Sequence, residues 1–153
     1  MLHQQYQMVL SSRATLFQYL KTIYPADFIA ENSTFGRGSI RNLLVHIADT
    51  YASWIGVKAL KKDILFENYI GYQNVNDCIA YFNIIDGYVE KFIETYNDNY
   101  HTEIEVLRNE KLISVTPLKL FTHVITHEFH HKGQIMSLSR HLNYTPIDAD
   151  IIR

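Results

Sequence analysis

The segment HVITHEFHHKGQ, residues 123–134, holds four histidines within nine positions. Residues four apart lie on the same face of a helix, so His127 and His131 can bind one metal ion together, and so can His123 and His127. The first of these two pairs is favoured because both members belong to an apolar stripe that we expect to face the core. The spacing therefore predicts a divalent-metal site built around His127 and His131.

A third ligand must come from elsewhere in the chain, because catalytic metal sites normally use three protein ligands. His46 is the natural candidate, since it lies in the middle of a predicted helix and beside its apolar face. Three neutral imidazoles would leave the charge of the metal uncompensated and its remaining positions open for water, substrate or a thiolate. Such a metal lowers the pKa of a bound nucleophile and polarises a carbonyl group.

The letters HEFHH also fit the H-E-x-x-H pattern of zinc peptidases, in which the glutamate, here Glu128, would act as general base. The extended form of that pattern fails, because Gln134 and Ser137 stand where glycine and histidine are required. Only 22 residues follow His131, and no substrate-binding edge strand is apparent upstream. A peptidase is therefore the less favoured interpretation.

Long helices must position these histidines. Apolar periodicity, capping residues and the scarcity of Gly and Pro predict four of them, over residues 3–23, 39–60, 74–96 and 117–142. In residues 101–115, charged and apolar residues instead alternate before a turn at RNEK, which predicts a β-hairpin or an extended excursion. We expect an all-α fold, a four-helix bundle with this long connection between its third and fourth helices. Bundles place metal sites in the core, on facing helices.

Composition limits the function classes. The chain has 153 residues, 47% of them hydrophobic and 20% charged, which predicts one globular domain over residues 1–153. A net charge of −2 argues against nucleic acid and anionic membranes as partners, and favours a small-molecule substrate. The single cysteine, Cys78, excludes an intramolecular disulfide and lies in an apolar run. With no signal peptide or membrane span evident, we expect a cytoplasmic protein.

Two segments resemble the DinB/YfiT-like family of metal-binding four-helix bundles: SIRNLLVHIADTYASWI around His46, and HVITHEFHHKGQIMSLSRHLNYTP near the end. The family's closing pattern is N-H-x-x-x-H-R-G-Q-I followed by L-G-x-x-P. As in that family, this chain has one histidine in an early helix and two histidines four residues apart near its end. The similarity extends over nearly the whole chain. The resemblance implies that His46, His127 and His131 form the metal triad, with zinc or nickel as the metal.

The departures from the family pattern remove no ligand. Lys132 stands where arginine is common, Thr126 where asparagine is frequent, and Asn143 where glycine usually ends the helix. The pair Gly133 and Gln134 is retained. We expect Gly133 to permit close helix approach, and Gln134 to form a hydrogen bond near the site.

The resemblance implies a divalent-metal-dependent enzyme, and we expect a thiol S-transferase in which the metal activates a low-molecular-weight thiol. Two alternatives stay open: a metal-dependent hydrolase that activates water, and a non-catalytic metal-binding bundle. Homodimer formation is expected because the first and last helices carry extra apolar residues. The candidates for pocket, positioning and proton-handling roles are Asp49, Tyr51, Trp54, Glu128 and Gln134.

Overall fold

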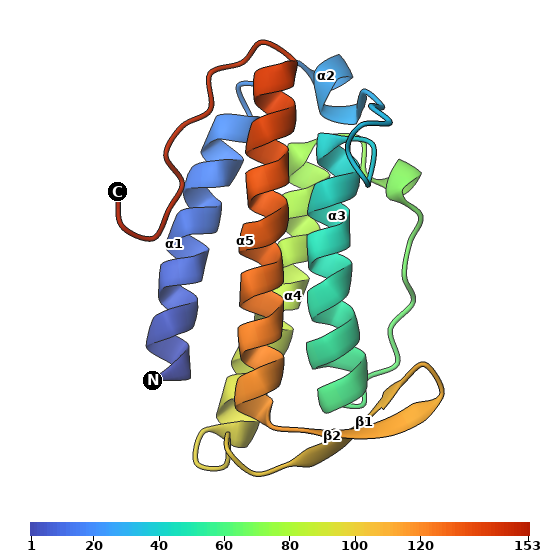
Figure 1. Ribbon diagram of the computed structural model, residues 1–153, viewed down its shortest axis with the longest axis vertical. Helices are drawn as coiled ribbons and strands as arrows, with labels where there is room; N and C mark the ends of the chain where they lie inside the picture. The colour runs from blue at the N-terminus through green and yellow to red at the C-terminus, as the bar shows by residue number, and fades with distance from the viewer.

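The computed structural model describes residues 1–153 and is mostly helical, with one small two-stranded sheet. The four longest helices lie side by side in Figure 1: α1 (Leu2–Leu20), α3 (Ile40–Tyr51), α4 (Val75–Tyr96) and α5 (Pro117–His141). The short helix α2 (Pro25–Ile29) lies at one end of the molecule, and the hairpin lies at the other. The predicted four-helix bundle accounts for the four long helices but not for α2 or the two-stranded sheet, so the structure confirms that prediction only in part.

Three of the long helices begin at the residues that the sequence indicated. The side chain of Ser39 caps α3 by accepting from the backbone of the first turn. Asn74 and Asp77 form a reciprocal capping box at the start of α4. Thr116 caps α5, whose first residue is a proline. The predicted starts of these helices are confirmed.

The first two helices differ from the prediction in how they end. The chain leaves α1 at Leu20, and Pro25 opens α2 instead of simply stopping the first helix. After α3 the helix continues as a π-helical segment, η1 (Ala52–Ala59). A methyl group added at Gly56 would lie 2.5 Å from Cδ1 of Ile64, so a larger residue there would require the Ile64 side chain to move. That connection reaches α4 through a 3₁₀ turn, η2 (Tyr69–Gly71).

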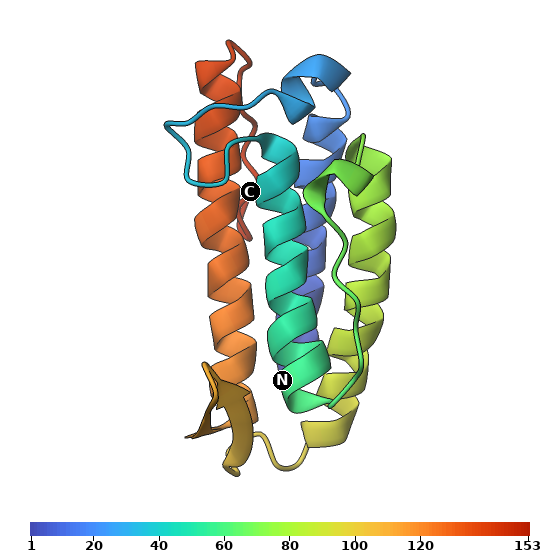
Figure 2. The same ribbon diagram turned by 90° about the vertical axis from the view of Figure 1, so that its right-hand side faces the viewer.

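The predicted hairpin is present as β1 (Ile104–Arg108) paired antiparallel with β2 (Lys111–Val115). Asn109 and Glu110 join the strands with φ values of 48° and 63°, as a two-residue type I′ turn requires. Val106 is fully buried, whereas its neighbours Glu105 and Leu107 are exposed, so alternate residues face the helices. Figure 2 shows the hairpin folded against the beginning of α5.

A single core of 35 buried residues fills the space between the long helices. The C-terminal tail leaves α5 at Asn143, which has a φ of 70°, and runs back along α1 (Figure 1). Ser12 of α1 donates a hydrogen bond of 2.5 Å to the carbonyl oxygen of Ala149, which holds the tail in place. None of the helices combines the length and apolar character needed to cross a membrane.

Candidate metal centre

The packing of α3 against α5 brings together the three histidines named from the sequence. His46 comes from α3, and His127 and His131 come from one face of α5. One ring nitrogen from each lies within 4.8 Å of the other two. His131 is 8% exposed and the other two side chains are half-buried, so the cluster is reachable from solvent on one side. Their role as metal ligands stays a prediction.

One pair of ring nitrogens has the separation that a shared metal ion would give. The Nε2 atoms of His127 and His131 lie 3.1 Å apart, and two ligand nitrogens on tetrahedral zinc, at Zn–N of about 2.0–2.1 Å, lie about 3.3 Å apart. Gln134 Oε1 lies 2.6 Å from His131 Nδ1. An N–H at that nitrogen donates to the amide oxygen and leaves the Nε2 lone pair facing the cluster. His127 Nδ1 is buried without a hydrogen-bond partner.

The histidine cluster is neutral at physiological pH. Burial lowers the pKa of His46 to about 4, and the charges of Arg37 and His131 act in the same direction. Burial and the neighbouring histidines lower the pKa of His127 to about 4. Burial also lowers the pKa of His131, although its hydrogen bond to Gln134 opposes the shift. A neutral imidazole is the form that binds a metal, so protons do not compete for the site near pH 7.

Arg37 lies beside the cluster and was not anticipated from the sequence. One of its guanidinium nitrogens, Nη2, lies 3.2 Å from His46 Nε2. The loop before α3 presents it: Gly38 has a φ of 86°, a conformation suited to glycine, and Asn42 donates to the Arg37 carbonyl oxygen at 2.8 Å. An exposed cation therefore faces the cluster from the α2 side.

Glu128 follows His127 directly, but its carboxylate is bound elsewhere. Arg13 Nε and Nη2 each donate to one of its oxygens at 2.8 Å, and the Tyr51 hydroxyl donates at 2.6 Å. Glu128 is 1% exposed and Arg13 is 2% exposed. A carboxylate held in this buried ion pair is not free to serve as the general base of a zinc peptidase. Glu128 and Tyr51 thus belong to a buried polar network, and the proton-handling and pocket roles considered for them stay predictions.

Asp49 lies one helical turn after His46 and is tied to the neighbouring helix. Its carboxylate accepts a hydrogen bond of 2.8 Å from the Tyr81 hydroxyl of α4. Burial raises the pKa of Asp49, whereas the bond from Tyr81 and the charge of Arg37 oppose the rise. The observed contact is thus an α3–α4 link, and a role of Asp49 in catalysis stays a prediction.

Trp54 lies in η1 and borders a cavity of about 170 Å³ beside the histidine cluster. Its indole ring packs against the ring of His123, with 5.1 Å between centroids. His123 is one turn before His127 on α5, and their ring centroids are 6.0 Å apart. The cavity therefore lies between η1, the hairpin and the beginning of α5, near His123, and a substrate-pocket role of Trp54 stays a prediction.

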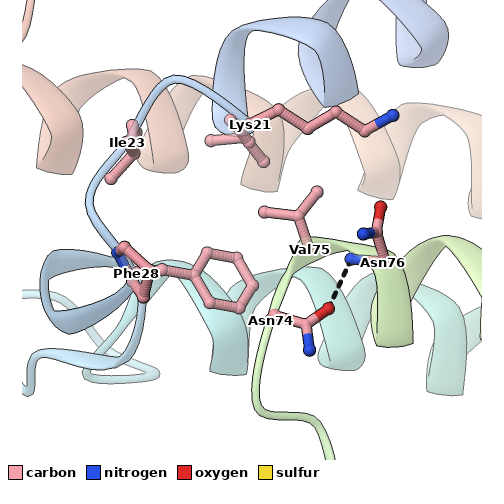
Figure 3. Close-up of a pocket in the computed structure, with 8 residues that line it drawn as sticks. Lys21, Ile23, Phe28, Asn74, Val75 and Asn76 are labelled. Atoms are coloured by element: carbon pink, nitrogen blue, oxygen red, sulfur yellow. Dashed lines mark hydrogen bonds between the residues drawn. The ribbon is translucent and has the colours of Figure 1, made fainter.

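A second cavity, drawn in Figure 3, lies between the end of α1, α2 and the start of α4. It has a volume of about 150 Å³ and is lined partly by apolar side chains such as Ile23, Phe28 and Val75. The side chain of Asn74 accepts from the Asn76 backbone at 2.9 Å and is used in capping α4. No histidine lines this cavity, so we assign it to packing between helices.

Sequence reasoning missed two charged groups and misjudged one glycine. Arg13 had a signal, because it stands four residues after Val9 and three before Leu16 on an apolar stripe. Arg37 lies in a loop and had no periodic signal. A methyl group added at Gly133 would meet no atom within 4 Å, so the expectation that this glycine permits close helix approach is wrong.

Similarity to known proteins agrees with the histidine pattern and the helical fold. The model of the DinB family matches residues 1–153. The uncharacterized protein YizA of Bacillus subtilis (strain 168) is 28% identical over 124 residues, which are 81% of this chain and 77% of that protein. The family match includes both helices that carry the cluster. The chain therefore belongs to the DinB family.

Proposed function

We propose that this protein is a divalent-metal-dependent enzyme that transfers a low-molecular-weight thiol to a small electrophile. The observation that supports it most is the convergence of His46, His127 and His131 within 4.8 Å, in neutral form and reachable from solvent. A zinc or nickel ion held there would supply a Lewis acid that lowers the pKa of a thiol. The small-molecule substrate and the homodimer remain predictions.

The chain itself offers no reactive thiol. Its single cysteine, Cys78, is 1% exposed, and burial raises its pKa to about 12. A thiol of that kind is inert at neutral pH. A thiol transfer at this site would therefore use an external cosubstrate.

Thiol transfer suits the side chains around the histidines better than hydrolysis does. The carboxylate nearest in sequence, Glu128, is held by Arg13 and Tyr51, so a hydrolase at this site would rely on the metal alone to ionise its bound water. A thiol loses its proton far more readily than water. In the proposed reaction the thiol sulfur bonds to an electrophilic carbon, the leaving group departs with its bonding electrons, and the thiol proton passes to solvent.

Two residues of the chain would tune the site. Gln134 holds the Nδ1 proton of His131 and so keeps the opposite nitrogen available as a ligand. Arg37 places a positive charge at the open side of the cluster, where it favours an anionic thiolate over a neutral thiol. Arg37 and Gln134 are positioning residues in this proposal, and the histidines hold the metal.

The metal site is tested by zinc and nickel titration calorimetry on metal-free protein that carries no His tag. His46→Ala, His127→Ala and His131→Ala should each weaken binding by more than about 100-fold, since even loss of a supporting partner costs about 10–100-fold. His123→Ala and His130→Ala are matched controls from the same helix and should keep the affinity. Equal losses in the controls, or full affinity in His46→Ala, would remove the basis of the proposal.

The reaction class is tested with metal-loaded protein and 1-chloro-2,4-dinitrobenzene, with and without a panel of small thiols. We expect turnover only when thiol is present, and loss of turnover in His127→Ala. Turnover of ester substrates without thiol would instead support a hydrolase. No metal-dependent turnover with either panel, together with intact metal binding, would support a non-catalytic metal-binding protein.

A further inference from the structure

The cavity beside Trp54 is lined by cations that no acidic group neutralises. Arg108 comes from the end of β1 and Lys119 from the first turn of α5, and both border the cavity. Neither forms one of the ion pairs of the structure, and no Asp or Glu lines the cavity. Two cations without an acidic partner at one hollow favour an anion as its occupant.

The rest of the lining is aromatic and apolar. Trp54 forms one wall, and Lys58 Nζ lies 4.8 Å from the centroid of its ring in a cation–π contact. Ile113, Val115 and Leu120 supply the apolar surface. The volume of about 170 Å³ is close to that of engineered cavities of about 150 Å³ that hold benzene. The cavity therefore suits an organic group the size of a phenyl ring that carries negative charge.

The hairpin pairing explains why these side chains meet. Arg108 is opposite Lys111, and Val106 is opposite Ile113, so Arg108 and Ile113 lie on the same face of the hairpin as the buried Val106. That face packs toward η1 and α5. A shift of one residue in the pairing would turn Arg108 away from the cavity.

The cavity lies about one helical turn from the histidine cluster, on the side of His123. The His123 ring lines the cavity, contacts Trp54 and lies 6.0 Å from the His127 ring. A molecule whose reacting atom sits at the three histidines would therefore need only a short tail to extend past His123 into the cavity.

We propose that this cavity binds the carboxylate-bearing tail of a molecule that reacts at the histidine cluster. Arg108 and Lys119 hold the carboxylate, and Trp54 covers the apolar part of the tail. The identity of the reaction rests on the proposed function, but binding of the anion does not. The carboxylate belongs either to the thiol or to the electrophile.

The first test measures binding to metal-free protein, prepared with a chelator that is then removed by desalting. The probes are phenylsuccinate, phenylacetate and phenylacetamide, which carry two, one and no carboxylates. Trp54 is the only tryptophan, so its fluorescence reports occupancy directly, and calorimetry provides a second measurement. We expect affinity in the order phenylsuccinate, phenylacetate, phenylacetamide, and weaker binding of the anions in high salt. Equal binding of phenylacetamide and phenylacetate would overturn the proposal.

Variants locate the anion. Arg108→Gln and Lys119→Gln should each weaken phenylsuccinate binding by about tenfold, the effect of losing one charge-assisted hydrogen bond. Arg140→Gln removes one positive charge from the last turn of α5, at the other end of the helix from Lys119, and Arg140 does not line the cavity, so the affinity of this control should stay unchanged. Unchanged affinity in the first two variants, or an equal loss in Arg140→Gln, contradicts the assignment. All three residues are exposed, and circular dichroism checks that the variants fold.

A second test assigns the carboxylate to the thiol or the electrophile. Cobalt-loaded protein is titrated with 6-mercaptohexanoate and 6-mercaptohexanol, and the thiolate–cobalt absorption band is followed. Tighter binding of the carboxylate, lost in Arg108→Gln, assigns the cavity to the thiol. Equal binding of the two thiols, with phenylsuccinate still bound in the cavity, assigns it to the electrophile.

The same experiments separate this inference from the proposed function. Phenylsuccinate binding without any uptake of zinc or cobalt would leave the anion site standing and remove the metal-dependent reaction. Metal uptake without phenylsuccinate binding would do the opposite.

Discussion

His127 and His131 hold their Nε2 atoms 3.1 Å apart, at a distance where two lone pairs repel unless a proton or a cation lies between them. The third member, His46, instead has Arg37 beside it, at 3.2 Å from Nε2. That guanidinium competes with a metal in two ways, because it engages a lone pair and adds positive charge. The affinity of the site for a metal ion therefore depends on Arg37 as well as on the three histidines.

At this scale we predict that Arg37→Gln strengthens zinc binding by about three- to tenfold, equivalent to about 1 kcal/mol for one partly exposed charge. Zinc titration calorimetry of the metal-free protein measures the change. Arg140→Gln is the control, because Arg140 is an exposed arginine in the last turn of α5. Weaker zinc binding in Arg37→Gln would show that the guanidinium supports the site instead of competing for it.

The elements α1, α4 and α5 are joined by one buried polar network around Arg13. Its Nη1 donates to Asp86 of α4 at 2.6 Å, and its other nitrogens bind Glu128 of α5. The Tyr6 hydroxyl donates to the same Asp86 oxygen at 2.6 Å. The position of α5, and with it of His127 and His131, depends on this network.

Arg13→Met should lower the free energy of unfolding by about 3–5 kcal/mol, because it leaves the Glu128 carboxylate buried without a counter-ion. Arg13→Met combined with Glu128→Gln should recover most of that loss, since the glutamine is neutral and can still accept from Tyr51. Urea denaturation measures both. Lys91→Ala, which breaks the exposed pair with Glu94, is the control and should leave stability nearly unchanged. If the double variant loses as much free energy of unfolding as the sum of the two single variants, the ion pair does not explain the effect of Arg13→Met.

The hairpin is another element whose stability can be tested. Glu110 holds a φ of 63°, which disfavours a residue with a side chain by about 1–2 kcal/mol. Glu110→Gly should therefore raise the free energy of unfolding by about 0.5–1 kcal/mol, after the entropic cost of glycine is subtracted.

Thermal denaturation checks the effect, and Lys111→Gly provides the contrast, because Lys111 lies in the extended strand and should lose stability. If the hairpin holds Arg108 in place as proposed, Glu110→Gly also keeps phenylsuccinate affinity. A destabilised Glu110→Gly protein would mean that the turn is not of the type described.

For the whole molecule, the lowered pKa values predict how stability depends on pH. The folded pKa of His46 and of His127 is about 4, below the ordinary value of 6.5. As the pH falls, these histidines therefore bind protons in the unfolded chain at a higher pH than in the folded protein. The free energy of unfolding is greatest above about pH 6.5 and decreases as the pH falls toward 4.

Urea midpoints of the metal-free protein between pH 7 and pH 5 measure this decline, above the range in which most carboxylates titrate. A His46→Ala, His127→Ala double variant should show a shallower decline. Saturating zinc at pH 7 should raise the melting temperature of the parent and not of the double variant. A pH-independent midpoint in the parent would contradict the depressed pKa values.

The sequence alone indicated where three of the long helices begin and which histidines would cluster. Helix starts at Ser39, Asn74 and Thr116 are local features, because capping depends on residues within one turn. The pair His127 and His131 follows from helical spacing alone. His46 was the expected third ligand because it lies beside the apolar face of the second predicted helix. The turn of the hairpin is local for the same reason.

Tertiary structure decided which side chains are free to act. Glu128 is adjacent to His127 in the sequence, yet Arg13, 115 residues earlier, binds its carboxylate. Arg37, Arg108 and Lys119 carry no periodic signal, and only the packing of a loop and a hairpin onto the helices brings them to the cluster and its cavity. Such contacts join residues far apart in the chain. No local pattern encodes them, because they depend on the relative placement of whole elements.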